Sequence, residues 1–263
     1  MILNNISFAG AGRVAGALCM EFYRSGIRIN KIVSESGINA RQLAGMCKAS
    51  WSTELIFTDS TDLIIVAVPD NRLEETLRKI ECGEDTLVAH TAGSYGLDVF
   101  PAGMKKTGIL YPLQTFSKGR NILFRDLPFF IEASDTDSAD ILRNLAESIG
   151  GKVHFADAGR RKMLHLAGVF ACNFVNHMLT AGNEIAVRAG FSPEVLNPLI
   201  LETVSKAMEK GAAVSQTGPA VRNDLNTIEK HLELLSFSPE LQGMYREITQ
   251  SIVTHYKNQL RNG

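Results

Sequence analysis

The segment 6–16 constrains the fold of this chain more than any other part of the sequence. A short apolar run, 6–9, leads directly into the glycine-rich stretch 10–16, which reads GAGRVAG. The first glycine allows a tight turn, the second lets the backbone approach an anion, and the small residues that follow let a helix pack close to a sheet. Such a turn presents backbone N–H groups to the pyrophosphate of a dinucleotide. We therefore predict that the pyrophosphate is bound by Gly10, Ala11, Gly12, Arg13 and Val14.

The residues around this turn complete a βαβ unit. The segment 14–24 places Val14, Leu18 and Phe22 on one helical face, and a second strand is expected over 29–33. Strand, glycine turn, helix and strand then fit within roughly thirty residues, the size of one βαβ unit. This context favours a dinucleotide site over the alternative, an ordinary helix N-terminus.

Strand and helix patterns alternate through the first part of the chain. The β-branched run 63–68 predicts a central strand that is buried on both faces. Further strands are expected over 55–57, 86–90, 108–111, 128–131 and 152–155, with helices over 40–47, 73–80 and 138–149. The alternation predicts an α/β domain over residues 1–156, built on a doubly wound, mostly parallel Rossmann sheet.

The pattern changes from residue 157 onward. Strand signals disappear, and helical periodicity runs through 160–190, 193–211, 223–235 and 239–260. Two of these segments begin at a proline, which is well tolerated at a helix start because the missing N–H costs nothing there. We therefore expect an all-α C-terminal domain over residues 157–263.

The composition argues against several classes of protein. The net charge of −1 gives no reason to expect nucleic acid or an anionic membrane as a partner. We find no apolar run long enough to cross a bilayer, and the chain begins directly with its first strand, leaving no room for a signal peptide. The four cysteines lack the spacing of a zinc site or a disulfide framework. We expect a cytoplasmic protein with reduced thiols and no metal site.

The carboxyl ends of the strands are the expected ligand site, because ligands of open α/β sheets bind where the strand order reverses. Two strand ends besides the glycine turn therefore matter, 68–70 and 90–93. We expect them to flank the ribose and the ring of a nicotinamide. The residues assigned to this role are Val68, Pro69, Asp70, Thr91, Ala92 and Gly93. For the proline, an equally open alternative is that it only ends its strand.

The end of the second strand decides which nicotinamide cofactor is bound. An acidic residue there accepts hydrogen bonds from the ribose 2′-hydroxyl of NAD, whereas an arginine pairs with the 2′-phosphate of NADP. Glu35 favours NAD, unless it is a solvated surface residue. Ser34, Ser36 and Arg41, together with Arg13, could instead hold a phosphate. The residues alone leave both cofactors open.

Five motifs carry a resemblance to a known family: GAGRVAG at 10–16, VAVPD at 66–70, HTAG at 90–93, YPLQTF at 111–116 and TGPAVRND at 217–224. Together they resemble a group of oxidoreductases that join a Rossmann-like NADP-binding domain to the helical domain of unknown function 2520. More distantly, the chain is similar to pyrroline-5-carboxylate reductases and to β-hydroxyacid and 6-phosphogluconate dehydrogenases. The resemblance covers essentially the whole chain. It implies a nicotinamide-dependent reductase or dehydrogenase, with NADP slightly favoured, whose helical domain forms a homodimer and closes the substrate side of the cleft.

Two positions depart from the family pattern. A histidine often precedes the PLQT motif, and this chain has Tyr111 there, which keeps a hydrogen-bonding tip but cannot serve as a base near neutral pH. An arginine that is common near the end of the second strand in NADP-dependent relatives is Ser36 here. The second departure weakens the preference for NADP.

The helix that opens the second domain is the best candidate for catalytic groups. On a regular helix, Lys162, His165, Asn173 and Asn176 lie within one broad face. Related dehydrogenases place a lysine and an asparagine on the equivalent helix, so the resemblance implies that His165 or Lys162 exchanges the proton while Asn173 orients the substrate. His165 is preferred because imidazole suits proton exchange near neutral pH. The alternatives are a histidine bonded to the backbone and an asparagine that joins two helices.

Two further residues are assigned to the substrate. Arg222, in the turn that also holds Asp224, could clamp a substrate carboxylate in bidentate fashion. An equally open alternative is an Arg222–Asp224 pair that caps the next helix. Gln114, with Thr115 beside it, follows a strand of the sheet and is expected to line the cleft.

These features favour an enzyme that transfers hydride between a nicotinamide and a small polar carbonyl, imine or alcohol, bound in a cleft between the domains. The alternative is a non-catalytic dinucleotide-binding protein, such as a redox sensor or a regulatory subunit. The family histidine that Tyr111 replaces keeps this alternative open. A purely structural dimerisation module would leave the glycine turn unexplained.

Overall fold

The chain divides into two compact units, residues 1–173 and 174–263. The computed structural model describes residues 5–57, 61–117 and 119–262. Strands end at residue 155, close to the boundary expected from the sequence pattern, and the first unit continues beyond it through the helix α5 (Ala158–Gly168).

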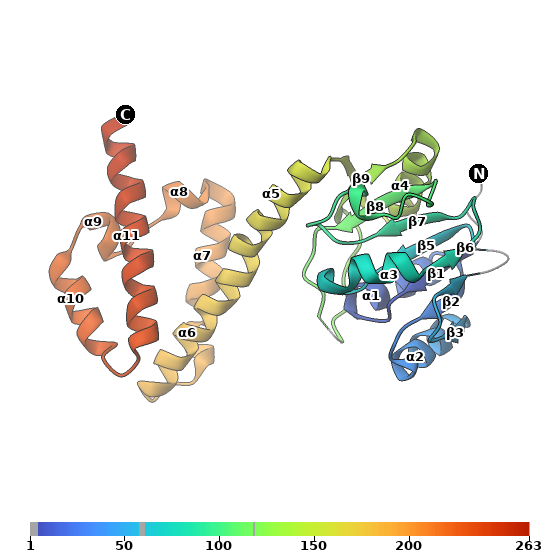
Figure 1. Cartoon of the computed structure of the whole chain (residues 1–263). Helices are drawn as coiled ribbons and strands as arrows, with labels where there is room; N and C mark the ends of the chain where they lie inside the picture. Colours follow the sequence, from blue (N-terminus) through green and yellow to red (C-terminus); the bar gives the residue numbers. More distant parts are fainter. Residues whose placement is uncertain (1–4, 58–60, 118, 263) are drawn as a thin grey trace. The chain divides into compact units, whose positions relative to one another are not determined.

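The first unit is built on an eight-stranded sheet in the order β10-β9-β8-β7-β5-β1-β2-β3 (Figure 1). In this order the strands span Lys152–Phe155, Pro128–Ala133, Thr107–Pro112, Leu87–His90, Leu63–Val66, Asn5–Ala9, Arg28–Val33 and Ser50–Ser52. Strands β8 and β9 pair antiparallel, and the other neighbours pair parallel. The order reverses beside β1, because β2 pairs on one side of it and β5 on the other. The predicted doubly wound, mostly parallel Rossmann sheet is confirmed.

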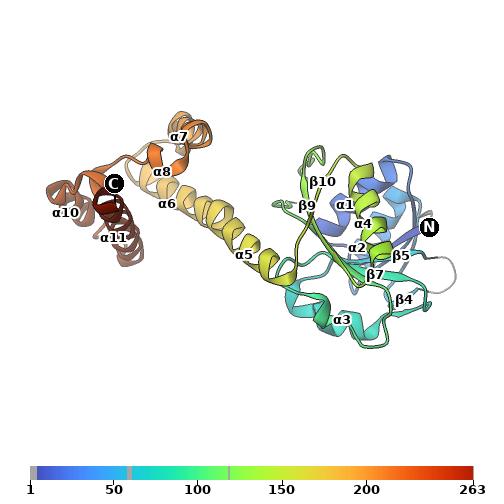
Figure 2. The same cartoon turned by 90° about the horizontal axis from the view of Figure 1, so that it is seen from above.

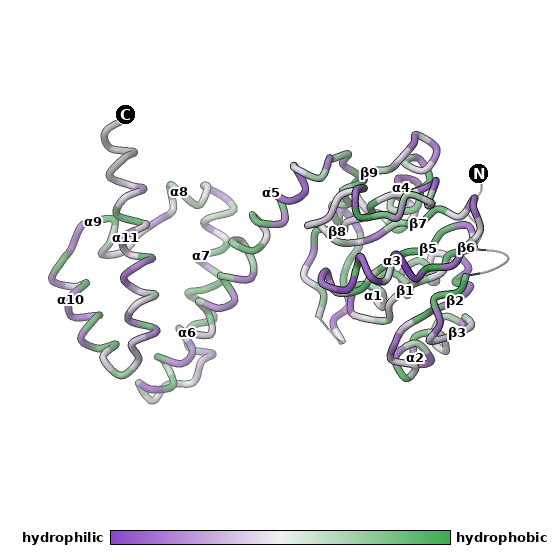
Figure 3. The backbone as a smooth tube through the Cα atoms, in the orientation of Figure 1, coloured by the Kyte–Doolittle hydropathy of each residue, from purple (hydrophilic) through white to green (hydrophobic). Residues whose placement is uncertain are grey.

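Helices cover both faces of the sheet (Figure 2). The helices α1 (Arg13–Arg24), α2 (Gly37–Cys47) and α4 (Thr136–Ser148) lie on one face, and α3 (Leu73–Lys79) lies on the other. The central strand β5 reads LIIV and is hydrophobic throughout (Figure 3), because its alternate side chains point into two different cores.

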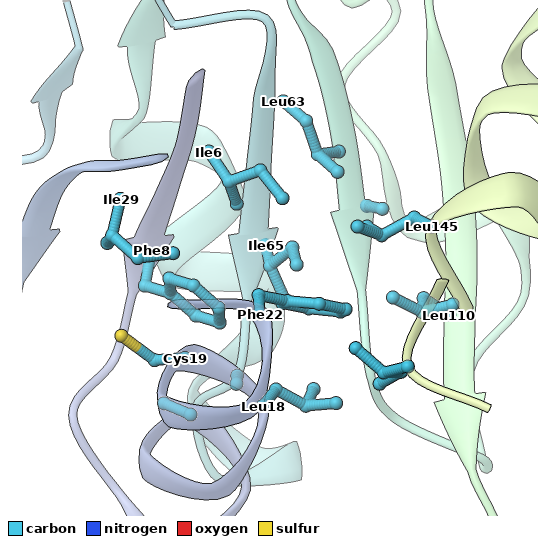
Figure 4. Packing of buried hydrophobic residues seen from close by; sticks show 14 of the residues in the cluster. Ile6, Phe8, Leu18, Cys19, Phe22, Ile29, Leu63, Ile65, Leu110 and Leu145 are labelled. Atoms are coloured by element: carbon cyan, nitrogen blue, oxygen red, sulfur yellow. The ribbon is translucent and has the colours of Figure 1, made fainter. Parts of the chain in front are cut away.

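The larger core packs α1 and α4 against the sheet (Figure 4). Phe8 of β1 and Phe22 of α1 are fully buried there, in the same cluster as Leu110 of β8 and Leu145 of α4. Burying side chains of this size stabilises the fold by about 1.5–3 kcal/mol each. This packing fixes the glycine turn, which joins β1 to α1.

Three local predictions for the sheet need correction. The strand expected over 63–68 ends at Val66, because its partner β1 ends at Ala9 and turns away at Gly10. The edge strand β3 was not expected, since its polar sequence SWS carries no apolar run. The strand expected over 55–57 forms as β4 (Ile56–Phe57), but it pairs with β6 (Glu81–Cys82) in a separate sheet.

Two of the four cysteines meet in the core although they are far apart in sequence. The Sγ atoms of Cys19 on α1 and Cys47 on α2 lie 3.0 Å apart, and both residues are buried. All four cysteines are free thiols. Their spacing in the sequence gives no signal for this pair, because packing of two helices brings it together.

The helix expected over 160–190 is not regular. It consists of α5, a π-helical turn over Val169–Phe174, and α6 (Val175–Arg188). The second unit continues with α7 (Asn197–Lys210), α8 (Ala212–Ser215), α9 (Pro219–Arg222), α10 (Leu225–Leu234) and α11 (Pro239–Asn262). Over the described part of the chain, no helix is both long and apolar enough to span a membrane.

Large apolar side chains of the second unit are exposed. Its buried apolar residues, among those described, are Ala181, Ala186, Ala220 and Leu235. Apolar and polar residues alternate along α6 and α7 (Figure 3). A unit with so few large side chains in its own interior leaves much apolar surface to be covered.

Candidate active site

The turn after β1 has the properties of an anion site. Gly10 has φ +114°, and a Cβ atom there would lie 2.3 Å from the carbonyl oxygen of Ala67, so only glycine fits. Gly12 forms the N-cap of α1 without any side-chain hydrogen bond, and α1 has no acidic residue in its first turn. A Cβ atom at Gly12 would meet no described atom within 4 Å. The first N–H groups of α1 are therefore available to an anion.

The residues after β2 are exposed and polar. Glu35 forms an ion pair with Arg72, which follows β5 in the short 3-10 turn Asp70–Arg72. Ser36 caps α2, because its side chain accepts a hydrogen bond from the N–H of Asn39 at 3.4 Å. Arg41 lies exposed on α2. Sequence reasoning assigned no role to Arg72, because its position in the sequence does not reveal that it meets Glu35.

The loops after β5 and β7 are joined at the same edge of the sheet. Val68 and Pro69 follow β5, and the carboxylate of Asp70 accepts a hydrogen bond from the hydroxyl of Ser94. Ser94 lies in the loop 91–96 that follows β7. The strand ends that were expected to flank a nicotinamide are thus brought together.

His90 holds the loop 91–96 in place through its side chain. Its ring is fully buried and stacks on Phe100, with ring centroids 5.3 Å apart. Nδ1 accepts a hydrogen bond from the N–H of Ala92 at 3.2 Å, and Nε2 donates to the carbonyl of Gly96 at 3.4 Å. Burial lowers the pKa of His90 to about 4. The ring is therefore neutral near pH 7 and serves to fix the loop.

Tyr111 and His165 meet at this edge of the sheet. The hydroxyl of Tyr111, on β8, lies 3.2 Å from Nδ1 of His165, on α5. Gly93 packs against the tyrosine ring so closely that a Cβ atom there would lie 2.7 Å from it. Burial, and then the charge of Asp70, raise the pKa of Tyr111. The phenol therefore keeps its proton and can donate it to Nδ1, which leaves the proton of a neutral His165 on Nε2.

Arg161 ties α5 to the sheet one helical turn before His165. Its side chain is fully buried and pairs with the carboxylate of Glu132 on β9. It also donates to the carbonyl oxygens of Ala156 and, at 3.0 Å, Tyr95. Residues four apart lie on the same face of a helix. Because Arg161 is held against the sheet, His165 also lies on the side of α5 that faces the sheet. Sequence reasoning missed Arg161, since an arginine in a basic run reads as a solvated residue.

The predicted site residues Lys162, Gln114 and Asn173 are exposed. Lys162 lies on α5, and Gln114 follows β8, where its side chain accepts a hydrogen bond from the N–H of Thr115 at 2.8 Å. Asn173 lies in the π-helical turn. The prediction that it shares a face with His165 assumed regular α-helical spacing, and the wider turn breaks that spacing. Its role stays a prediction.

Arg222 and Asp224 lie in the second unit. Arg222 ends α9, and Asp224 caps α10 by accepting hydrogen bonds from the N–H and the hydroxyl of Thr227, at 3.1 and 2.7 Å. The hydroxyl bond, the largest effect, and the N–H bond hold the pKa of Asp224 below its ordinary value. The helix cap expected as one alternative is therefore made by Asp224, while the proposed role of Arg222 at a substrate stays a prediction.

Two family profiles match the chain. A Rossmann-like domain matches residues 4–115, and DUF2520, a domain of unknown function, matches residues 127–252. Among curated proteins, none matches this sequence.

Solved structures resemble the chain over nearly its full length. A protein from Bacteroides fragilis, provisionally named an NADP oxidoreductase, is 38% identical, with a TM-score of 0.90 over 95% of this chain and 98% of that one. A reductive aminase from Aspergillus terreus, in complex with NADPH and ethyl-5-oxohexanoate, is 14% identical, with a TM-score of 0.69 over 99% and 94%. A pyrroline-5-carboxylate reductase from Coxiella burnetii is 16% identical, with a TM-score of 0.54 over 97% and 98%. The last two share the fold.

Proposed function

Because the chain belongs to the family of proteins that join a Rossmann-like domain to the domain of unknown function DUF2520, we propose that it is an NAD(P)-dependent oxidoreductase. Its substrate is a small polar carbonyl, imine or alcohol. The observation that carries the proposal is the pairing of Tyr111 with His165 beside the loop 91–96. It supports the proposal because it brings an imidazole, a group suited to proton exchange, to the edge of the sheet where Rossmann folds bind their ligands.

The cofactor in this proposal lies along the carboxyl edge of the sheet. The uncapped start of α1 holds the pyrophosphate, and the loops that begin at Val68 and Thr91 flank the nicotinamide. When bound, the nicotinamide supplies or accepts the hydride. We propose NADP as the preferred form, which the name of the Bacteroides fragilis relative supports.

The protein residues handle the proton and the orientation of the substrate. His165 exchanges a proton with the substrate oxygen or nitrogen through Nε2, while Tyr111 holds Nδ1 and sets the direction of the ring. Arg161 keeps α5 in place for this purpose. The remaining assignments of the proposal are Asn173 for orienting the substrate, Lys162 as the alternative proton carrier, and Gln114 and Arg222 for its polar groups.

We propose that the helical unit forms a homodimer. Leu201, Val204 and Met208 support the dimer, because they follow one face of α7 and are 70%, 46% and 82% exposed. The resemblance to the family implies that a second copy of the chain covers this face of α7. We also propose a cytoplasmic location, which the four free thiols support.

Binding and turnover measurements test the proposal in two steps. We expect thermal stabilisation by NADP(H), followed by turnover within a panel of carbonyls, imines and alcohols, read by the absorbance of reduced nicotinamide. The variant His165→Ala should lose turnover and keep cofactor binding, whereas His177→Ala, an exposed histidine on α6, should keep both. Failure to bind any dinucleotide would refute the proposal. Binding without turnover across the panel would favour the sensor, and full turnover in His165→Ala would refute the catalytic assignment.

A further inference from the structure

Arg72 follows one of the two strands that flank the glycine turn. Strands β2 and β5 pair with β1 on opposite sides, so the residues that follow them lie on either side of the turn after β1. Glu35 follows β2, Arg72 follows β5, and their side chains form an ion pair. Glu75 lies 3.6 Å from Nε of the same arginine. The guanidinium is thus held beside the residue that decides between the two nicotinamide cofactors.

We propose that Arg72 selects NADP by exchanging Glu35 for the 2′-phosphate. The inference rests on the proposed function, since it assigns a residue to the cofactor site proposed above. A carboxylate after β2 accepts hydrogen bonds from the ribose hydroxyls of NAD and repels a phosphate. The guanidinium reverses this preference, because it can leave the exposed carboxylate and offer a planar pair of donors to the phosphate oxygens.

The exposure of the two side chains makes the exchange feasible. Glu35 is 82% exposed and Arg72 is 44% exposed. An ion pair this open to solvent is weak, whereas a phosphate monoester carries more charge than a carboxylate and can bind the guanidinium through two oxygens. Arg72 can therefore turn from Glu35 to a 2′-phosphate at little cost, and Glu75 can keep its contact with Nε.

Two other cationic side chains near the glycine turn and α2 also favour the binding of an anion. Arg13 in the glycine turn and Arg41 on α2 are both exposed, and the first turn of α2 contains no acidic residue. The segment 34–36 that follows β2 reads SES and contains no cationic residue. Arg72, which follows β5, thus supplies the cation that is missing after β2. Its position in the sequence alone does not reveal this role.

Titrations of NADPH and NADH into the purified full chain test the inference. Arg72→Met should weaken NADPH binding by about tenfold or more, the loss expected for one charge-assisted contact, and leave NADH binding nearly unchanged. Glu35→Gln should strengthen NADPH binding, because it removes the competing carboxylate. The matched control is Arg78→Met, which removes an exposed arginine paired with Glu74 near the other end of α3 and should change neither affinity.

A competition experiment isolates the phosphate. Adenosine 2′,5′-bisphosphate should displace NADPH from the wild type better than adenosine 5′-monophosphate does, and Arg72→Met should abolish the difference. Unfolding curves of each variant check that the fold is kept. The inference is overturned if wild type binds both dinucleotides equally, or if Arg72→Met weakens NADH and spares NADPH, which would mean that the arginine only orients Glu35. Failure of wild type to bind either dinucleotide would instead refute the proposed function and this inference with it.

Discussion

The phenol oxygen of Tyr111 lies 3.2 Å from Nδ1 of His165, although the two residues are 54 positions apart in the chain. One belongs to a strand of the sheet and the other to the helix that follows the last strand. The contact fixes one ring nitrogen of the histidine and leaves the other for a ligand. In the proposed function Tyr111 therefore positions His165 and does not act as a base.

Removing the tyrosine hydroxyl tests this relationship. Tyr111→Phe keeps the ring that packs on Gly93 and loses the hydrogen bond to His165. We expect kcat to fall by about ten- to hundredfold, because a general acid–base group that is poorly oriented loses much of its contribution. NADPH affinity and the unfolding temperature should stay close to those of the wild type. A kcat equal to that of the wild type would show that the contact does not matter for the reaction.

A methyl group added to the loop 91–96 should disturb the contact between Tyr111 and His165 while leaving both side chains intact. A Cβ atom at Gly93 would lie 2.7 Å from the Tyr111 ring, so Gly93→Ala must displace the ring or the loop 91–96. We expect a lower kcat, with a loss at least as large as that of Tyr111→Phe. Gly103→Ala, where a Cβ atom would meet no described atom within 4 Å, is the control. Unchanged turnover in Gly93→Ala would contradict the close packing.

The sequence was informative where local chemistry specifies the structure. The glycine turn and the β-branched run of β5 each carry a pattern that only a few backbone arrangements satisfy, and both formed as predicted apart from the end of β5. His165 was chosen on chemical grounds, and its role stays a prediction. Its partner Tyr111 was noted only as a departure from the family, because their contact depends on how α5 packs on the sheet. Arg161 and Arg72 were missed for a related reason: an arginine in a sequence does not reveal whether it is buried or which carboxylate it meets.

The two glycines of the turn should respond differently to alanine. Gly10→Ala places a Cβ atom 2.3 Å from the Ala67 carbonyl oxygen at φ +114°, so we expect a loss of roughly 2–5 kcal/mol in the free energy of unfolding. Gly12→Ala meets no described atom within 4 Å, and its unfolding curve should match that of the wild type. Its methyl group stands where the pyrophosphate approaches, so NADPH binding should weaken by about tenfold or more. Normal NADPH binding in a well-folded Gly12→Ala would argue against the assigned cofactor site.

The exposed apolar face of α7 should mediate self-association. Leu201→Glu combined with Met208→Glu puts two charges on that face, and burying unpaired charge in an interface is costly. Light scattering should find a dimer for the wild type and a monomer, or a much weaker dimer, for the double variant. Lys210→Glu, a charge reversal at an exposed position in the last turn of α7, should leave the dimer intact. A monomeric wild type would refute the proposed homodimer.

Buried His90 should make the stability of the protein depend on pH below neutrality. Burial lowers the pKa of His90 from 6.5 to about 4, so between these pH values the unfolded chain takes up a proton that the folded protein excludes. The contribution of neutral His90 to the free energy of unfolding is complete above about pH 6.5 and is lost as the pH falls toward 4. The loss amounts to about 3 kcal/mol. Urea unfolding at a series of pH values should therefore show that the free energy of unfolding falls less in His90→Gln than in the wild type, by about this amount. This comparison does not depend on the stability of the variant at pH 7. His177→Gln, which changes an exposed ring, should decline like the wild type, and a parallel decline in His90→Gln would show that the buried ring is not the cause.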